Sequence, residues 1–265
     1  MNHVSPAKLA RIERRLSSHD RLVIENLDRV RLATTEQLHR LLAVTEPTTL
    51  RRSQAKLAKL RSLGAITRLD RNVGGVRAGS TGHVYALDTT GQRLASGCGP
   101  AGGRRRRRPW TPGLPFIAHQ LTVTELYVRL REAEGDDLAV LDFDAEPLCW
   151  RTFTGVGGAR AVLKPDAFLR LGFGSYQDTY FIEVDQATQS LPAINRKLVV
   201  YRRFYATGRE QERYGAFPQV LFLAPSEERR AALADLIERQ PDEIRRFAAV
   251  ALQDDAPDLF TEGGP

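Results

Sequence analysis

Cysteine and long apolar runs are scarce in this sequence, and each shortage excludes a class of protein. Its two cysteines, Cys98 and Cys149, lie far apart, so we expect free thiols in a reducing cytoplasm rather than a disulfide. They lack a nearby histidine pair, which argues against a structural zinc site. No run of about 18 apolar residues could span a membrane, and residues 1–15 have no apolar segment typical of a secretory signal. No glycine-rich phosphate loop follows a strand, so no nucleotide pocket is expected.

Positive charge is concentrated in the first half of the chain. Residues 1–113 contain 22 of the 39 Lys and Arg and 8 of the 32 Asp and Glu, whereas residues 114–265 contain 17 and 24. Such a division indicates two modules with different roles. Phosphate backbones attract a concentration of cations through counterion release. An acidic membrane surface would do so too, but no amphipathic helix with a bulky apolar face is present to anchor one.

The basic half has the order of elements typical of a winged helix-turn-helix. Apolar spacing predicts helices over residues 21–32, 36–42 and 50–63, and strands over 65–70 and 83–88. The segment that joins the two strands is rich in glycine and contains Arg71 and Arg77. Three helices followed by a hairpin place the third helix in the major groove of DNA and the hairpin tip along a phosphate strand.

The third helix presents a cationic face. Leu50, Ser53, Leu57 and Leu60 line its inner side, and Arg and Gln on the outer side have donor patterns suited to guanine and adenine. The predicted DNA-binding residues are Thr49, Arg51, Arg52, Gln54, Lys56, Lys59, Arg71 and Arg77. A solvated surface helix and a winged helix that binds protein are the alternatives.

A linker is predicted between the two modules. Residues 97–115 contain five Gly, four Pro and five consecutive arginines, with too little apolar content to form a core. Five adjacent cations repel one another unless an anion lies nearby, so we expect nucleic-acid contacts from Arg104, Arg105, Arg106, Arg107 and Arg108. A solvated tether is the alternative. The predicted domains are thus residues 1–96 and 116–265 on either side of the linker 97–115.

The second module is predicted to be α/β in pattern, in the order αβββαβα. The predicted helices are 116–131, 191–206, 227–238 and 242–252, and the predicted strands are 138–143, 161–171, 179–185 and 219–224. Pro165 would confine its strand to a bulge or a sheet edge. The whole chain is therefore expected to have an α+β fold.

Carboxylates stand within these apolar strands. Asp166 follows Pro165 directly, and Glu183 and Asp185 are two residues apart and so share one face of their strand. A carboxylate in such surroundings is costly unless it is paired or binds a metal. Asp166 and Glu183 on adjacent strands would suit Mg²⁺ or Mn²⁺, which polarises a phosphodiester and activates water. A relic metal site, or a structural cluster with Lys197 as the partner ion, is the alternative.

This arrangement resembles the PD-(D/E)xK nuclease superfamily, which has a restriction-endonuclease-like αβββαβ domain. The matching residues are Pro165-Asp166 and, after seventeen residues, Glu183-Val184-Asp185. Asp185 stands where that pattern has a lysine. The resemblance implies that Lys197, or alternatively Arg196, replaces this lysine from the following helix, and that Glu125 corresponds to the glutamate of the first helix. The implied catalytic residues are Asp166, Glu183, Asp185 and Lys197, and the implied metal ligands are Asp166, Glu183 and Glu125.

The chain also resembles the replication-relaxation family of plasmids and integrative elements, over about residues 15–235. The matching stretches are 119–121, 164–166, 181–188, 196–201 and 217–220. The resemblance implies a cytoplasmic protein of a mobile element that acts in DNA replication or mobilisation, with metal-dependent nicking as a possible activity. The alternative is a non-catalytic replication accessory or transcriptional regulator with a degenerate nuclease fold. Tyr201 is interpreted as a core aromatic rather than a nucleophile.

The expected partner is double-stranded DNA. Other plasmid replication or transfer proteins and a second copy of the chain, in a homodimer, are further candidates. No membrane partner is expected.

Overall fold

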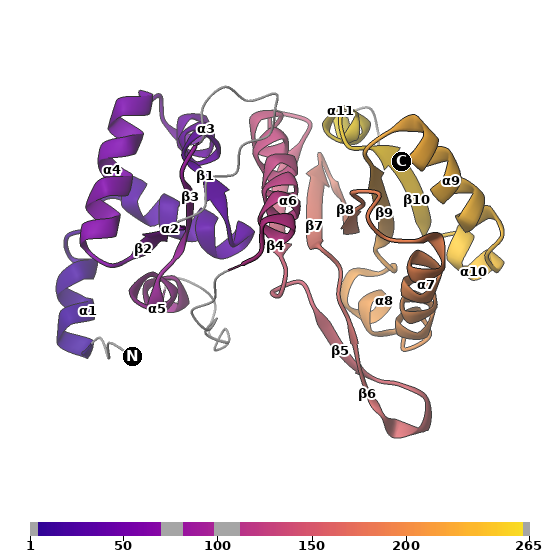
Figure 1. Ribbon diagram of the computed structural model, residues 1–265. Helices are drawn as coiled ribbons and strands as arrows, with labels where there is room; N and C mark the ends of the chain where they lie inside the picture. The colour runs from indigo at the N-terminus through magenta and orange to yellow at the C-terminus, as the bar shows by residue number, and fades with distance from the viewer. Residues whose placement is uncertain (1–4, 70–81, 98–111, 262–265) are drawn as a thin grey trace. The chain divides into compact units, whose positions relative to one another are not determined.

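The computed structural model describes residues 5–69, 82–97 and 112–261 (Figure 1). The chain divides into two compact units, Met1–Val128 and Arg129–Pro265, which are described separately below. Both contain helices and strands, so the predicted α+β class is confirmed. In the described ranges, no helix combines the length and the apolar character that crossing a membrane requires.

The helices at the start of the first unit begin at capping side chains. These helices are α1 (Pro6–Glu13), α2 (Ser18–Val30), α3 (Thr35–Thr45) and α4 (Leu50–Ser62). Ser17 and Thr34 form capping boxes with Asp20 and Gln37, and the Thr49 hydroxyl accepts from the backbone N–H of Arg52. The three predicted helices are confirmed, and α1 is an addition to them.

A small antiparallel sheet accompanies these helices. Its strands are β1 (Ala33–Thr34), β2 (Ile66–Arg68) and β3 (Val84–Leu87), in the spatial order β1-β3-β2. The predicted pairing of the two hairpin strands is confirmed, because Ile66 lies opposite Leu87 and Arg68 opposite Tyr85. Helix α5 (Thr89–Gly97) follows. The tip of the hairpin, with Arg71 and Arg77, lies outside the described residues.

The long helix α6 (Leu114–Glu132) supplies part of the core of the first unit. Ile117 packs with Leu32 and Val84. The Gln120 amide donates to the Val30 carbonyl (3.1 Å), and the Thr124 hydroxyl donates to the Leu32 carbonyl (2.6 Å). The structural units therefore divide within α6, whereas the sequence analysis places the second domain from residue 116 onward.

The second unit is organised around a mixed five-stranded sheet in the order β10-β9-β8-β7-β4. Its strands are β4 (Ala139–Ala145), β7 (Ala167–Phe173), β8 (Tyr176–Val184), β9 (Gln219–Ala224) and β10 (Ala248–Leu252). Strands β8, β9 and β10 are parallel neighbours, whereas β4, β7 and β8 are antiparallel. Strand β9 and the second half of β8, Tyr180–Val184, are almost entirely buried, as expected for strand segments covered on both faces.

One face of this sheet is covered by helices that bury an aromatic core. The helices are α7 (Leu191–Tyr205), α9 (Glu227–Glu238) and α10 (Asp242–Arg245). Phe181 of β8 and Phe222 of β9 pack there against Leu198, Tyr201 and Phe204. Tyr201 is fully buried, which confirms its interpretation as a core aromatic.

A two-stranded hairpin, β5 (Arg151–Thr154) and β6 (Arg160–Leu163), extends from the second unit (Figure 1). The turn η1 (Val156–Gly158) joins its strands, and Phe153 contacts Phe204 of α7 with ring centroids 5.2 Å apart. The short helices α8 (Arg209–Tyr214) and α11 (Ala256–Thr261) complete the unit. Cys149, at the base of the hairpin, is a buried free thiol, as predicted; Cys98 lies outside the described residues.

Two predicted elements are wrong. The strand predicted over 161–171 is two strands, β6 and β7, in different sheets, because Lys164-Pro165-Asp166 interrupts the pairing. The helix predicted over 242–252 is α10 followed by the strand β10. Residues 248–252 are a short apolar run that suits a buried parallel strand as well as a helix, and periodicity alone does not separate the two.

Candidate functional site

Helix α4 exposes its polar residues on the side away from the core. Ser53, Leu57 and Leu60 are buried, whereas Arg51, Arg52 and Gln54 are exposed, as is the capping residue Thr49. Lys56 is half-buried. The helix therefore places side chains with major-groove donor patterns on its free surface near its N-terminus.

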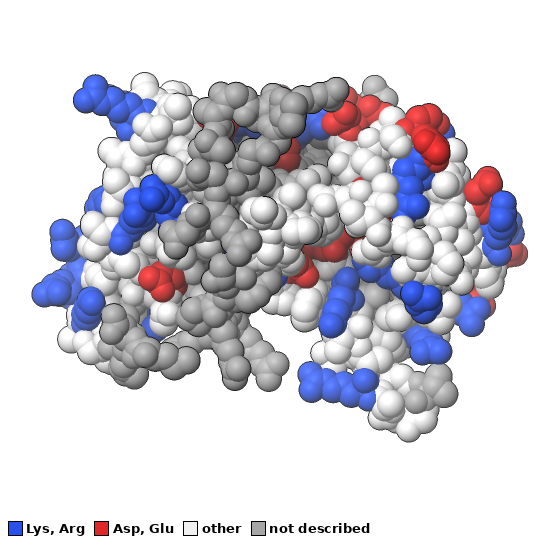
Figure 2. All heavy atoms as spheres, viewed as in Figure 1, with Lys and Arg blue, Asp and Glu red and all other residues white. Residues whose placement is uncertain are grey.

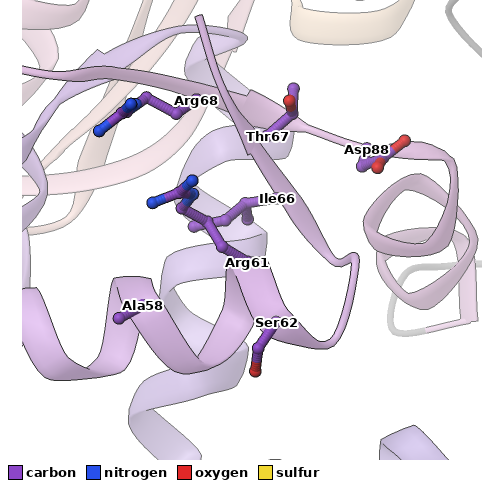
Figure 3. Close-up of a pocket in the computed structure, with 7 residues that line it drawn as sticks. All are labelled: Ala58, Arg61, Ser62, Ile66, Thr67, Arg68 and Asp88. Atoms are coloured by element: carbon purple, nitrogen blue, oxygen red, sulfur yellow. The ribbon is translucent and has the colours of Figure 1, made fainter.

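A groove of about 610 Å³ lies between α4 and the edge strand β2. Figure 3 shows Arg61 from α4 and Arg68 from β2 on this groove, together with Ser62 and Thr67. Arg51, Gln54, Ala58 and Arg61 are spaced by three or four residues, so they follow one side of the helix toward β2. We call these four residues, with Arg68, the α4 surface.

Arg61 and Arg68 are not among the DNA-binding residues that the sequence predicts. The position of Arg61, seven residues after Gln54, was a usable signal, because it places Arg61 on the same side of the helix. Arg68 gave no such signal, since its strand is only three residues long and its neighbours follow from the fold. Arg68 Nη1 lies 3.2 Å from Nε2 of His83, which immediately precedes the adjacent strand β3.

Lys59 has a structural partner. Its ammonium donates to the Asp20 carboxylate of α2 and to the Arg15 carbonyl (3.1 Å). The Asp20 side chain is only 1% exposed. Burial acts to raise the pKa of Asp20, but hydrogen bonds from Lys59 and Ser17 prevail and hold it below its usual value. Lys59 therefore neutralises a buried charge that joins α2 to α4.

The other predicted DNA-binding cations lie outside the described residues. They are Arg71 and Arg77 in the hairpin tip and Arg104, Arg105, Arg106, Arg107 and Arg108 in the linker. Their predicted contacts stay predictions.

Asp166 and Glu183, with Asp185, form the acidic cluster of the second unit. Asp166 immediately precedes β7, and its backbone N–H donates to the Ile182 carbonyl of β8 (3.0 Å). The Asp166 carboxylate accepts from the backbone N–H of Val184 (2.8 Å). The structure thus places Asp166 beside the end of the strand that contains Glu183, on neighbouring strands as the sequence analysis expects.

Glu183 is buried and hydrogen-bonded through both carboxylate oxygens. Lys197 of α7 donates to Oε2, and the Tyr201 hydroxyl donates to Oε1 (2.6 Å). Burial raises the pKa of Glu183 to about 7, with the Asp166 charge adding to the rise and Lys197 opposing it. The Glu183 charge in turn raises the pKa of Lys197, against the effect of burial. Lys197, the lysine that the resemblance implies, therefore contacts Glu183 directly.

Asp185 is engaged by a different helix. Its carboxylate accepts a hydrogen bond from Nε of Arg229 in α9, and its Oδ1 also accepts one from the backbone N–H of Ala187 (3.0 Å). Arg229 also donates to the Gln189 carbonyl (2.6 Å), so it ties the loop after β8 to α9. Arg229 was missing from the sequence analysis, because 44 residues separate it from Asp185 and no short motif contains both.

Glu125, the third predicted metal ligand, belongs to the first unit. Its Oε1 accepts from Arg40 (2.5 Å) and its Oε2 accepts from Gln37 (2.9 Å), so both oxygens bond to α3. The role of Glu125 at a metal stays a prediction.

The donor set around Asp166 does not fit a divalent metal as the side chains stand. Mg²⁺ requires several oxygen ligands in near-octahedral arrangement. Both oxygens of Glu183 are taken by Lys197 and Tyr201, and Asp185 is paired with Arg229. Among the described residues, no three His, Cys, Asp or Glu side chains gather as a metal-binding group. Within the cluster, Glu183 and Asp185 are buried carboxylates paired with Lys197 and Arg229, whereas Asp166 is half-buried and accepts from the Val184 backbone N–H.

Comparison with known proteins gives one match. The sequence model of a family described as replication-relaxation matches residues 24–220, which is about three quarters of the chain. The match runs from α2 to the start of β9 and so includes both the α4 surface and the acidic cluster. No curated protein and no solved structure matches the chain.

Replacement of Lys59 by methionine is expected to destabilise the first unit. The change leaves the Asp20 carboxylate buried without its ammonium, a loss of about 1 to 3 kcal/mol. Because the folded pKa of Asp20 is lowered, this contribution is present above the unfolded pKa of about 3.9 and is lost as the pH falls through the folded pKa. Urea unfolding followed by circular dichroism at pH 7 and pH 3 measures the difference.

Lys56→Met is the matched control, since Lys56 lies one turn earlier on the same helix and no ion pair is recorded for it in the described residues. Its stability should equal that of the wild type. Equal stability of the Lys59 and Lys56 variants at pH 7 would contradict the structural role of Lys59.

Proposed function

This chain belongs to the replication-relaxation family, and we propose that it is a DNA-binding protein that acts in the replication or mobilisation of a plasmid or integrative element. The first unit binds the double-stranded DNA. The observation that supports this most is the α4 surface, where arginines from a helix and from the adjacent strand line the same open groove.

The order of elements in the first unit supports a winged-helix mode of binding. Helices α2, α3 and α4 are followed by the paired strands β2 and β3. In this arrangement the N-terminal part of α4 enters the major groove, where Arg51 and Gln54 contact base edges. Arg61 and Arg68, which line the groove of the protein between α4 and β2, contact the phosphate backbone of the DNA. A double-stranded DNA partner is therefore proposed.

A winged helix that binds protein is the competing interpretation. Protein interfaces also use arginine, but they combine it with aromatic side chains and methionine. The groove beside the α4 surface is lined by two arginines, Arg61 and Arg68, with Asp88 as the acidic residue, and its described lining contains no aromatic residue or methionine. That balance favours a phosphate backbone as the partner.

The Arg51→Ala variant should bind duplex DNA about three- to tenfold more weakly than the wild type. Because the Arg51 guanidinium also brings a positive charge close to the phosphates, its loss should reduce the slope of log affinity against log salt by up to about one. Fluorescence anisotropy with a labelled duplex over a salt series measures both quantities. An affinity that does not change with salt would contradict the electrostatic account.

Arg239→Ala is the control for this experiment. Arg239 is an exposed cation of the second unit that pairs with Asp235 one turn away on α9. Its removal should leave both affinity and salt slope unchanged.

A second candidate function is metal-dependent nicking of DNA with Mg²⁺ or Mn²⁺. The observation in its favour is the placement of Asp166 beside Glu183, with Lys197 in contact. The contacts that neutralise Glu183 favour the non-catalytic alternative, in which this unit is a docking or dimerisation platform for replication or transfer proteins.

Supercoiled plasmid incubated with the wild-type protein and Mg²⁺ or Mn²⁺ should stay supercoiled. The physical reason is that Glu183 already bonds through both oxygens to Lys197 and Tyr201. Agarose gels measure the nicked fraction, and a mobility shift in the same sample shows that the protein is bound. Nicking that disappears with EDTA and in Asp166→Ala would establish the second candidate instead.

A further inference from the structure

The second unit separates its charges sharply, although its sequence is acidic overall. Residues 147–165 and 191–215 contain nine Lys and Arg and two Asp and Glu. The rest of residues 129–265 contains eight Lys and Arg and twenty-one Asp and Glu. The two cationic segments are the hairpin β5–β6 and the helices α7 and α8. We call them the cationic block.

The parts of the cationic block are joined by direct contacts. Phe153 of β5 packs on Phe204 of α7, and Arg209 of α8 donates to the Thr152 carbonyl of β5 (2.7 Å). Figure 2 shows Lys and Arg atoms over α7, α8 and the end of the hairpin, whereas acidic atoms gather toward α9 and α10. Residues far apart in sequence therefore form one positively charged surface.

Three exposed cations of this surface lack acidic partners. Arg160, Arg196 and Arg203 are exposed, and in the described part of the chain no carboxylate pairs with any of them. The exposed cations of the acidic side behave differently, since Arg239 pairs with Asp235 and Arg245 with Asp242. Unpaired arginines held on rigid elements repel one another, and an anion removes that cost.

The orientation of α7 explains why these arginines face outward. Lys197 and Tyr201 point inward to Glu183. Arg196 and Arg203 are seven residues apart and so lie on one line along an exposed side of the helix. Lys164, immediately after β6, is a further cation of the block and lies over the Trp150 ring with Nζ 4.7 Å from its centroid.

We propose that the cationic block is a second DNA-binding surface, which binds the phosphate backbone of one DNA strand beside the acidic cluster. This inference rests on the proposed function and deepens it, because it gives the second unit its own contact with DNA. Several arginines without acidic neighbours suit phosphates, which arginine binds in bidentate geometry. The contact is to the backbone, so it should be independent of base sequence.

The test uses the full-length triple variant Arg160→Ala/Arg196→Ala/Arg203→Ala. The slope of log affinity against log salt should fall by about 2 to 3, since each lost phosphate contact removes roughly 0.9. Affinity for labelled DNA of two unrelated sequences should fall about tenfold or more at low salt, equally for both. Fluorescence anisotropy measures these changes, and thermal melting verifies that the variant is folded.

Two controls isolate the surface. Arg239→Ala/Arg245→Ala removes paired cations from the same unit and should leave the slope at its wild-type value. Arg160→Lys/Arg196→Lys/Arg203→Lys keeps the charge and should restore most of the affinity.

The outcomes separate this inference from the proposed function. If Arg51→Ala weakens binding but the triple alanine variant keeps the wild-type slope of log affinity against log salt, the cationic block does not contact DNA. The first unit alone then binds it. A surface that serves an acidic protein instead gives this same result. If the wild type binds no DNA, both proposals are wrong.

Discussion

The burial of Glu183 in the apolar strand β8 is the constraint on which the second unit depends. A carboxylate at 2% exposure is strongly destabilising without partners. Lys197 and Tyr201 supply them from successive turns of α7, and these two contacts fix which side of α7 faces the sheet. The same contacts draw the aromatic core together around Tyr201 and Phe181, whose ring centroids are 5.8 Å apart.

The same arrangement of charged residues occurs in both units. Lys59 neutralises buried Asp20, and Lys197 neutralises buried Glu183, so one cation of each helix is structural. The remaining arginines of α4 and α7 are turned toward solvent, where nucleic-acid phosphate is the proposed partner. Neighbouring cations on one helix therefore differ in role according to whether a buried carboxylate lies opposite them. The net charge of a unit does not reveal this difference in role, because the second unit is acidic overall and still has a cationic surface.

The sequence predicts local features well and pairings across the fold poorly. The helices of the first unit follow from apolar spacing, and the neighbouring strands of Asp166 and Glu183 follow from short motifs. Arg229 and Arg68 were missed, because their partners are distant in sequence or set by strand pairing. The apolar run 248–252 was assigned to a helix, since its burial beside β9 is a tertiary effect.

The most direct measurement is a double-mutant cycle on Glu183→Gln and Lys197→Met. Urea unfolding is followed by Trp150 fluorescence in a Trp110→Phe background, so that the signal comes from the second unit. If Lys197 holds the buried carboxylate, each single variant loses stability, and the double variant loses at least about 1 kcal/mol less than the sum of the two. Additive losses would show that the two side chains do not interact and would contradict this account of the acidic cluster.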